Sequence, residues 1–284
     1  MTAIDDDVAR EPHSARAILE GRHLVKEYPV GARSGVLRRQ GAMRAVDDVS
    51  LSLIRGRVTA LVGQSGSGKS TLGRMLARLI RSTSGQILLE GRDVATRGSI
   101  RHREYVGDVQ LILQDPFASL NPLRRVSYIL GRAVRIHQDV RGDDQARGRS
   151  SELLERVGLT PTEHFLDRFP HELSGGERQR VSFARALAAS PKVLIADEPV
   201  SMLDVTIRKE MLDLIDDLRR DEDLAVLYIT HDLGSARRYS SEVLVMHHGR
   251  IVESGESDAV ITDPQHEYTR RLLAAAPDPA SRLS

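Results

Sequence analysis

Short apolar runs alternate with helix-like segments over most of this chain. The apolar runs have the length of strands that are buried in a sheet. They occur at residues 58–62, 84–91, 109–113, 193–196, 225–229 and 243–246. Apolar side chains recur at helical spacing between them, at residues 72–79, 181–188 and 211–218. This alternation predicts an α/β fold with a mainly parallel sheet that helices cover on both faces.

The N-terminal part of the chain has a different pattern. Residues 18–28 resemble a strand, and residues 45–53 alternate apolar and polar positions as a half-buried strand does. We expect an antiparallel β region here, with a loop or an exposed hairpin at residues 29–43. Residues 1–15 are charged and poor in apolar side chains, so we expect them to be disordered.

Residues 116–172 interrupt the alternation of strands and helices. Apolar residues have helical spacing at 126–134 and 153–157, and we expect the polar stretch at 141–150 to be a loop between helices. The segment is therefore predicted to be an inserted helical subdomain. The expected organisation is a core at 16–115 and 173–262, the helical subdomain at 116–172 and a C-terminal tail at 263–284.

Composition excludes several classes of function. The 284 residues include no cysteine, which rules out disulfides, thiol catalysis and cysteine-based metal sites. Lys and Arg total 41 against 40 Asp and Glu, and aromatic residues make up only 4% of the chain, so we expect no nucleic-acid partner. The acidic residues 1–7 do not resemble a secretory signal, and the apolar run 224–229 is too short to span a bilayer. These features fit a cytosolic protein.

The strongest chemical pattern lies between the strand at 58–62 and a helix. It is the phosphate-binding loop G-x-x-x-x-G-K-[ST], which here consists of Gly63, Gln64, Ser65, Gly66, Ser67, Gly68, Lys69, Ser70 and Thr71. Glycines let a backbone wrap closely around oxygens, and N–H groups at a helix start favour a polyphosphate. We expect Lys69 to reach the β- and γ-phosphates and the Ser70 hydroxyl to hold Mg²⁺. The flanking strand and helix disfavour the alternative, a flexible Gly/Ser linker.

An acidic pair follows the strand at 193–196. We expect Asp197 to hold Mg²⁺ directly or through water, and Glu198 to act as general base or to polarise the attacking water. The alternative is an acidic turn with no catalytic role. The presence of a phosphate loop in the same chain favours the catalytic interpretation.

A third pattern is Leu-Ser-Gly-Gly-Glu at residues 173–177. Ser174 and Glu177 have the spacing of a capping box, which predicts that a helix begins here. Capping boxes are common, but Gly175 and Gly176 leave the first N–H groups of the helix bare, and such a helix start favours an anion. We interpret these glycines as functional because a purely structural helix start does not need them.

Together these three patterns resemble the ATP-binding cassette (ABC) ATPases, over about residues 19–277. The Leu-Ser-Gly-Gly-Glu stretch is the specific mark of that family. The resemblance implies a RecA-like P-loop core that carries an inserted α-helical subdomain. It also implies that two cassettes, identical or paralogous, pair head to tail. Each ATP then lies between the phosphate loop of one cassette and Ser174, Gly175 and Gly176 of the other.

The resemblance assigns roles to four further residues. Tyr28 matches an aromatic residue that stacks on adenine, although an ordinary strand-end tyrosine is the alternative. Gln114 matches a glutamine that reaches Mg²⁺ and the attacking water and that senses the transmembrane partner. Asp204 matches a loop that contacts the opposite cassette, and His231 matches a histidine that contacts the γ-phosphate. The remaining histidines are interpreted as surface or structural residues, including His171, His247 and His266.

A narrower likeness is to the ATPases of oligopeptide, dipeptide and nickel importers. It rests on residues 113–122 and 263–273, and the insertion after Tyr28 resembles the second (F-type) ATPase of such systems. Two positions depart from the usual pattern, since Gln64 stands where glutamate is commoner and Met202 where alanine is commoner. The cysteine cluster that some relatives have near the C-terminus is absent.

We therefore expect an ATPase subunit of an ABC importer that uses ATP and Mg²⁺ at the cytoplasmic face of the membrane. Its expected partners are a second cassette, two transmembrane permease subunits and an extracytoplasmic solute-binding protein. Oligopeptides or dipeptides are the expected solutes. Nickel and sugar stay open as alternatives, because the permease and the solute receptor determine specificity.

Other classes of protein fit less well. A soluble ABC protein acting on DNA or ribosomes usually has a long coiled-coil insert or two cassettes, and this sequence contains neither. A metabolic P-loop kinase has no use for Leu-Ser-Gly-Gly-Glu. A regulatory cassette with a dead site is disfavoured because every expected catalytic group is present.

Overall fold

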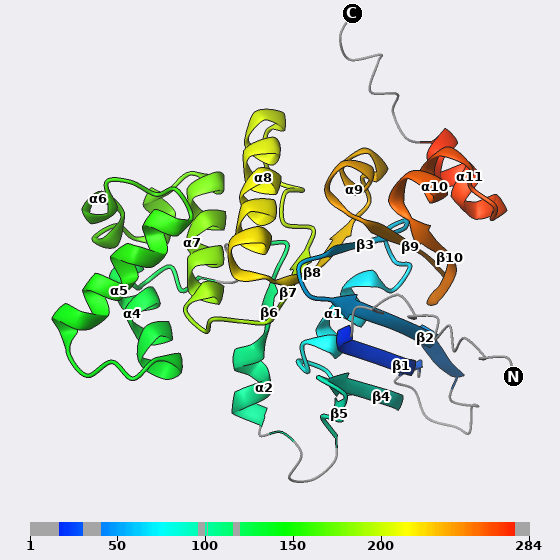
Figure 1. Ribbon diagram of the computed structural model, residues 1–284, viewed down its shortest axis with the longest axis horizontal. Coiled ribbons are helices and arrows are strands. Elements are labelled where there is room, and N and C mark those ends of the chain that lie inside the picture. Colours follow the sequence, from blue (N-terminus) through cyan, green and yellow to red (C-terminus); the bar gives the residue numbers. More distant parts are fainter. Residues whose placement is uncertain (1–16, 31–40, 96–99, 101, 116–119, 276–284) are drawn as a thin grey trace, which may run out of the picture.

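The computed structural model describes residues 17–30, 41–95, 100, 102–115 and 120–275, so the expectation of disorder at 1–15 lies outside the described residues. Its centre is a six-stranded sheet with the strand order β10-β9-β3-β8-β7-β6 (Figure 1). The strands are β3 (Val58–Val62), β6 (Val109–Ile112), β7 (Val193–Asp197), β8 (Ala225–Thr230), β9 (Glu242–His247) and β10 (Arg250–Glu256). All neighbours pair in parallel except β9 and β10, which confirms the predicted mainly parallel sheet.

Parallel pairing brings the carboxyl ends of the central strands to one edge of this sheet. Val62 at the end of β3 lies opposite Thr230 on β8. Asp197 at the end of β7 lies opposite Ile229, also on β8. The residues that follow these strands therefore begin at a common edge, and they are Gly63, Glu198 and His231.

A second, four-stranded antiparallel sheet covers part of one face. Its order is β2-β1-β4-β5, formed by β1 (Ala17–Val30), β2 (Gly41–Ile54), β4 (Ser84–Leu89) and β5 (Arg92–Asp93). The pairing of β1 with β2 continues to Val30 and Gly41, so these strands form a hairpin on either side of residues 31–40, which lie outside the described part. The antiparallel N-terminal region is thus confirmed.

Two apolar cores pack against opposite faces of the six-stranded sheet, because successive strand residues point to opposite sides. On β8, Val226 and Tyr228 belong to the core that contains α7 (Gly175–Leu187) and α8 (Val205–Glu222). Ala225 and Leu227 belong to the core that contains α1 (Lys69–Leu76) and the antiparallel sheet. Both faces of the parallel strands are therefore covered, as their continuous apolar runs require.

Helix α1 is shorter than the apolar spacing at 72–79 predicts. It ends at Leu76, and Arg78 has a left-handed backbone with φ of 55°. Leu79, expected on the buried helix face, is instead 62% exposed. The prediction was wrong at this residue because a left-handed residue reverses the chain direction and ends the regular helix.

The helices α4 (Val126–His137), α5 (Asp143–Arg156) and α6 (Thr162–Leu166) lie together at one end of the molecule, beside α7 (Figure 1). The prediction of a loop at 141–150 was wrong, because α5 begins at Asp143. Ala146 and Ser150, one turn apart, are buried, whereas the other residues of this first part of α5 are exposed. A helix that buries only a narrow stripe of small side chains has too little apolar periodicity to be recognised from sequence.

Five shorter helices complete the described part. They are α2 (His102–Asp108), the 3₁₀ helix η1 (Pro170–Glu172), α9 (Leu233–Tyr239), α10 (Ser257–Thr262) and α11 (Glu267–Ala274). None of the helices in the described ranges is long and apolar enough to cross a lipid bilayer. The last helix, α11, buries Tyr268 against the core that contains α7 and α8, so part of the tail at 263–284 packs on the core.

Candidate functional site

The phosphate loop at residues 63–71 connects β3 to α1. Its backbone passes close to two other segments, which accounts for two of its glycines. A Cβ atom at Gly63 would lie 2.2 Å from the Met246 carbonyl oxygen, and one at Gly68 would lie 2.2 Å from the Ala45 carbonyl oxygen. Both glycines also have positive φ angles, 153° and 108°. Any larger residue would push the loop away from β9 and β2.

Lys69 is the first residue of α1 and is 4% exposed. Its ammonium group donates to the carbonyl oxygens of Gly63 at 2.7 Å and Gln64 at 3.0 Å. Burial lowers the pKa of Lys69, and the negative charges of Glu198 and Asp197 oppose that shift. The cation therefore lies inside the curve of the loop, where it can turn to a bound phosphate.

Ser70 and Asp197 form a pair of oxygen groups beside this cation. The Ser70 hydroxyl donates to Asp197 Oδ1 at 2.9 Å. Burial raises the pKa of Asp197, and the hydrogen bond from Ser70 opposes the increase. The described residues contain no cluster of three or more His, Cys, Asp or Glu side chains that could hold a metal. One carboxylate and one hydroxyl suit Mg²⁺, which is usually held by one or two carboxylates together with waters and substrate phosphates.

Glu198 lies between two other predicted catalytic side chains. Gln114 Nε2 donates to Glu198 Oε2 at 3.1 Å, and His231 Nδ1 is 3.5 Å from Glu198 Oε1. Glu198 has a left-handed backbone with φ of 47°, which is strained for a residue with a side chain. Its N–H donates to the Ile229 carbonyl at 2.9 Å, and its own carbonyl accepts the Ser201 hydroxyl at 3.1 Å. These bonds hold the carboxylate at the end of β7, between Gln114 and His231.

Ser67 supplies a buried polar group inside the loop. Its hydroxyl is buried in the phosphate loop and has no hydrogen-bond partner among the described residues. Buried hydroxyls are normally hydrogen-bonded, so an unpaired one inside a cradle of N–H groups fits an anionic ligand with acceptor oxygens. Ser65 and Gly66 are exposed at the mouth of the loop, and Thr71 is half-buried in α1.

The predicted helix start at Ser174 is confirmed. Glu177 N–H donates to the Ser174 hydroxyl at 3.3 Å, and Ser174 N–H donates to Glu177 Oε2 at 2.7 Å, so the capping box is complete. Gly176 also has a packing role, which the sequence pattern does not reveal. A Cβ atom there would lie 2.8 Å from Ile207 Cγ2 of α8, whereas at Gly175 the nearest atom would be 3.4 Å away, on Leu203. Gly176 lets α8 approach α7, and only Gly175 is left without such a reason.

The start of α7 is not part of the site that the phosphate loop forms. In the described ranges, no hydrogen bond connects Ser174, Gly175 or Gly176 to residues 63–71. Figure 1 shows α7 beside α4 and α5, and α1 on the other side of β7 and β8. The structure therefore brings together the residues of the phosphate loop with Gln114, Asp197, Glu198 and His231, and leaves the α7 glycines apart from them.

Two further predicted residues lie at the surface. Tyr28 is near the end of β1, opposite Met43, and its ring lies 5.1 Å from the Lys26 ammonium. Asp204 precedes α8, and its side chain makes no capping hydrogen bond to that helix. Met202 and Val205, on either side of Asp204, are exposed apolar side chains.

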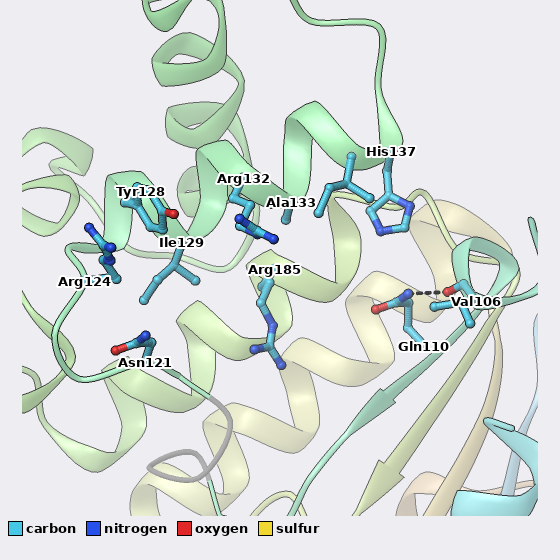
Figure 2. Close-up of a pocket in the computed structure, with 11 residues that line it drawn as sticks. Val106, Gln110, Asn121, Arg124, Tyr128, Ile129, Arg132, Ala133, His137 and Arg185 are labelled. Carbon is cyan, nitrogen blue, oxygen red and sulfur yellow. Dashed lines mark hydrogen bonds between the residues drawn. The ribbon is translucent and has the colours of Figure 1, made fainter. Parts of the chain in front are cut away.

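A separate groove of about 540 Å³ lies between α4, α7 and the segment from α2 to β6 (Figure 2). Three arginines line it, namely Arg124, Arg132 and Arg185. Tyr128 and Ile136 of α4 also line it and are exposed, as is the nearby Leu123. The groove therefore combines positive charge with apolar surface. It is distinct from the site at the ends of β3, β7 and β8.

Comparison with known proteins places this geometry in a family. A sequence profile described as "ABC transporter" matches residues 46–201, which is more than half of the chain. The chain belongs to the ABC transporter family. The match begins in β2 and ends after Glu198, so it includes the phosphate loop, the α7 start and the acidic pair.

Curated relatives of this ABC chain are named as importer subunits. It is 47% identical over 261 residues to the "Glutathione import ATP-binding protein GsiA" of Salmonella typhi, and 48% identical to the protein of that name from Escherichia coli K12. Each alignment covers 92% of this chain and 41% of the relative. The chain thus spans about two fifths of the length of the curated relatives that it matches.

Solved structures support the ABC fold. The cassette cbiO1 of Clostridium perfringens, described as part of the transporter complex cbiONQ, matches with a TM-score of 0.73 and 27% identity over 94% of this chain and 98% of that one. The cassette MJ0796, described as a dimeric post-hydrolysis state bound to ADP and phosphate, matches with a TM-score of 0.71 and 24% identity over 84% and 98%. At that identity the second match concerns the fold alone.

The sequence did not reveal the residues of the C-terminal part of the chain that contact the phosphate loop. The backbone of Met246 packs against Gly63, and the Gly249 N–H donates to the Ser67 carbonyl at 2.9 Å. The Gln64 N–H donates to the hydroxyl of Tyr268, at 3.1 Å. His247, interpreted as a surface or structural residue, stacks on that tyrosine with ring centroids 3.7 Å apart. Nothing in the local pattern at residues 246–268 could have indicated these contacts.

Proposed function

We propose that this chain binds ATP together with Mg²⁺ and hydrolyses it. The observation that carries the proposal is the convergence of three groups at the carboxyl edge of the parallel strands. These groups are the Lys69 ammonium, the Ser70–Asp197 pair and the Gln114–Glu198–His231 cluster. A cation, an oxygen pair suited to a hard metal and a carboxylate between two polar groups are the parts that hydrolysis of a terminal phosphate needs.

The residues present fit both the nucleotide and the metal. The unpaired Ser67 hydroxyl and the backbone of residues 63–71 suit phosphate oxygens. Ser70 and Asp197 would hold Mg²⁺, which when bound neutralises charge on the phosphates. Lys69 would exchange its bonds to Gly63 and Gln64 for phosphate oxygens, and its buried position would strengthen that interaction.

Glu198 is the residue that we propose activates water. Its carboxylate accepts a proton from the water whose oxygen attacks the terminal phosphorus. The bond from that phosphorus to the bridging oxygen breaks, and ADP and inorganic phosphate are released. Gln114 and His231 hold the carboxylate from its two sides, and His231 is placed to contact the phosphoryl group as it transfers.

Phosphate release from MgATP by the purified chain tests this function. Glu198→Gln keeps the size of the side chain and removes the base, so it should still bind ATP while hydrolysis falls by about 10²-fold or more. Glu152→Gln, which alters an exposed carboxylate on α5, is the matched control. Wild-type turnover in Glu198→Gln would show that Glu198 is not the base. Absence of ATP hydrolysis by the unaltered chain, both alone and with a second cassette and permease subunits, would refute the function.

A second cassette is the partner that completes the proposed site. The α7 start at Ser174 and Gly175 lies apart from the phosphate loop of its own chain, yet it has the bare N–H groups of an anion site. Head-to-tail pairing would bring it to the nucleotide of the other cassette. The exposed apolar residues Met202 and Val205 beside Asp204 suit burial in such an interface. Tyr28 would stack on the adenine within its own cassette.

We further propose that the chain energises an importer from the cytoplasmic face of the membrane, held there by two permease subunits. The groove between α4, α7 and β6 is the surface that we assign to the permease. Positive and apolar side chains line it, so a permease helix with acidic and apolar residues is the complementary occupant. Strand β6 leads from this groove to Gln114, which connects it to Glu198. The helical subdomain at 116–172 would move with the permease.

A small peptide is the solute that we propose, received from an extracytoplasmic binding protein. The relatives named for glutathione import support it, since glutathione is a peptide-like molecule. Purification of the membrane complex followed by transport of labelled glutathione, a dipeptide, nickel and a sugar would test it. Uptake of the metal or the sugar alone would refute the peptide assignment and leave the ATPase function intact.

A further inference from the structure

The C-terminal helix contacts the phosphate loop through one side chain. Gln64, the second residue of the loop, donates its backbone N–H to the hydroxyl of Tyr268 at 3.1 Å, across 204 positions of sequence. Tyr268 lies in the first turn of α11 and is 4% exposed. We propose that Tyr268 is a positioning residue that holds the phosphate loop in its ATP-binding shape and thereby sets the affinity for ATP. This inference rests on the proposed ATP-binding function.

Tyr268 is held both through its ring and through its backbone. It stacks on His247 with centroids 3.7 Å apart and an angle of 19° between the planes. Its backbone N–H donates to His266 Nδ1 at 3.1 Å, which caps the start of α11. A side chain whose ring and backbone are both fixed presents its hydroxyl with little loss of freedom.

Helix α11 is itself tied to the sheet that carries the loop. The Glu253 carboxylate on β10 accepts the N–H groups of Gln265 at 2.7 Å and His266 at 3.1 Å. Strand β10 pairs with β9, whose last residue is His247. The partner of the Tyr268 ring and the anchor of its helix therefore come from the same pair of strands, which lies next to β3.

Gln64 needs a support of this kind because the side chain that holds its carbonyl, Lys69, is the one that we propose binds phosphate. The Gln64 carbonyl accepts from Lys69 Nζ at 3.0 Å and from the Ser67 N–H at 3.2 Å. When Lys69 turns to a phosphate, it releases Gln64. The bond to Tyr268 does not involve Lys69, so it can persist in the ATP-bound state and keep the glycine-rich backbone ordered. Preordering of a loop reduces the entropy that binding costs.

This role predicts an effect on affinity and little effect on chemistry. The hydroxyl acts on the backbone of Gln64 and not on Glu198, which follows β7, so it supports the bound and transition states alike. Loss of such uniform support raises KM and leaves kcat unchanged. Since the contact uses the backbone N–H, replacing the Gln64 side chain by glutamate should not alter it.

Tyr268→Phe in the full-length chain tests the proposal, because it removes the hydroxyl and keeps the stacked ring. With MgATP as the ligand, we expect Kd and KM to rise about fivefold with kcat within about twofold of wild type. The Gln64 amide should also exchange its hydrogen faster. Tyr239→Phe is the matched control, since it removes a hydroxyl bonded to Asp213 away from the loop, and it should leave Kd, KM, kcat and the Gln64 exchange rate unchanged.

His247→Ala gives a second variant in case Tyr268→Phe folds poorly, and it should raise KM in the same direction by withdrawing the stacked ring. Wild-type Kd together with wild-type exchange at Gln64 in Tyr268→Phe would overturn the positioning role, as would a fall in kcat at unchanged KM. Failure of the proposed function would give a different result, because the unaltered chain would then not bind MgATP.

Discussion

The Ser70 hydroxyl donates to the Asp197 carboxylate at 2.9 Å, although the two residues are 127 positions apart. Ser70 lies in the first turn of α1 and Asp197 ends β7, and the parallel register places both at one sheet edge. This pair of oxygens matches the ligands that Mg²⁺ prefers, so the binding of Mg²⁺ by Ser70 and Asp197 is the first property to test. Both residues would bind the same ion, so their variants should show related defects.

Ser70→Ala should increase the Mg²⁺ concentration that gives half-maximal ATP hydrolysis by roughly 10-fold or more, since one ligand is removed. The measurement is phosphate release at fixed ATP over a range of Mg²⁺. Ser150→Ala is the control, because it removes a buried serine hydroxyl that donates to the Ala146 carbonyl within α5. An unchanged Mg²⁺ requirement in Ser70→Ala would assign the metal to other groups.

Lys69→Ala should abolish detectable hydrolysis and weaken ATP binding, because it removes the cation that lies inside the curve of the phosphate loop. Binding of a fluorescent ATP analogue and phosphate release are the two measurements. Lys209→Ala, which removes an exposed lysine paired with Asp213 on α8, is the control. Turnover retained in Lys69→Ala would contradict the assignment of residues 63–71.

Gly63→Ala should destabilise the folded protein as well as impair ATP binding. The added Cβ atom would lie 2.2 Å from the Met246 carbonyl oxygen at a φ of 153°, so backbone must move. Overpacking of this kind typically costs about 1–3 kcal/mol. Denaturant unfolding measures the loss, and Gly148→Ala is the control because open space surrounds its Cβ position. Equal stability of the two variants would show that the loop relaxes freely.

Mixed cassette dimers separate the two halves of the proposed site. If one subunit carries Gly175→Trp and the other Lys69→Ala, both defects fall on one composite site in the head-to-tail arrangement, and the other site stays intact. Such dimers should keep up to about half of wild-type hydrolysis, whereas dimers with both changes on one subunit damage both sites. The reverse ranking would refute the trans arrangement.

Glu253 gives a pH-dependent prediction for the attachment of α11. Burial raises the pKa of this carboxyl, but the Thr269 side chain and the N–H groups of Gln265 and His266 together outweigh it and hold the pKa below the ordinary value of 4.5. Because the pKa is lower in the folded state than in the unfolded state, the ionised carboxylate stabilises the fold. This stabilisation is complete at pH values above the unfolded pKa and is lost as pH falls through the folded pKa. Thermal unfolding of wild type should therefore lose stability relative to Glu253→Gln as pH falls below about 4.5. A constant difference between the two proteins down to pH 3 would contradict this.

Several features follow from local sequence alone, because they depend on neighbours within a turn or a strand. The buried strands at β3, β7 and β8 are continuous apolar runs, and the start of α7 follows from the spacing of Ser174 and Glu177. The phosphate loop, the acidic pair and the antiparallel N-terminal strands could likewise be predicted. These residues carry their structural preference in their own immediate pattern.

Tertiary structure alone decided the rest, because the deciding contacts join residues far apart in sequence. The close approach of Ile207 on α8 requires a glycine at position 176. The left-handed backbone of Arg78 ends α1 and leaves Leu79 exposed. Residues 143–150 form a helix that buries only a narrow stripe of small side chains. The strained φ of Glu198 and the burial that lowers the pKa of Lys69 arise only in the assembled sheet. The contact of Tyr268 with Gln64 depends on β9 and β10 carrying the tail back to the loop, and no periodicity of the chain encodes that return.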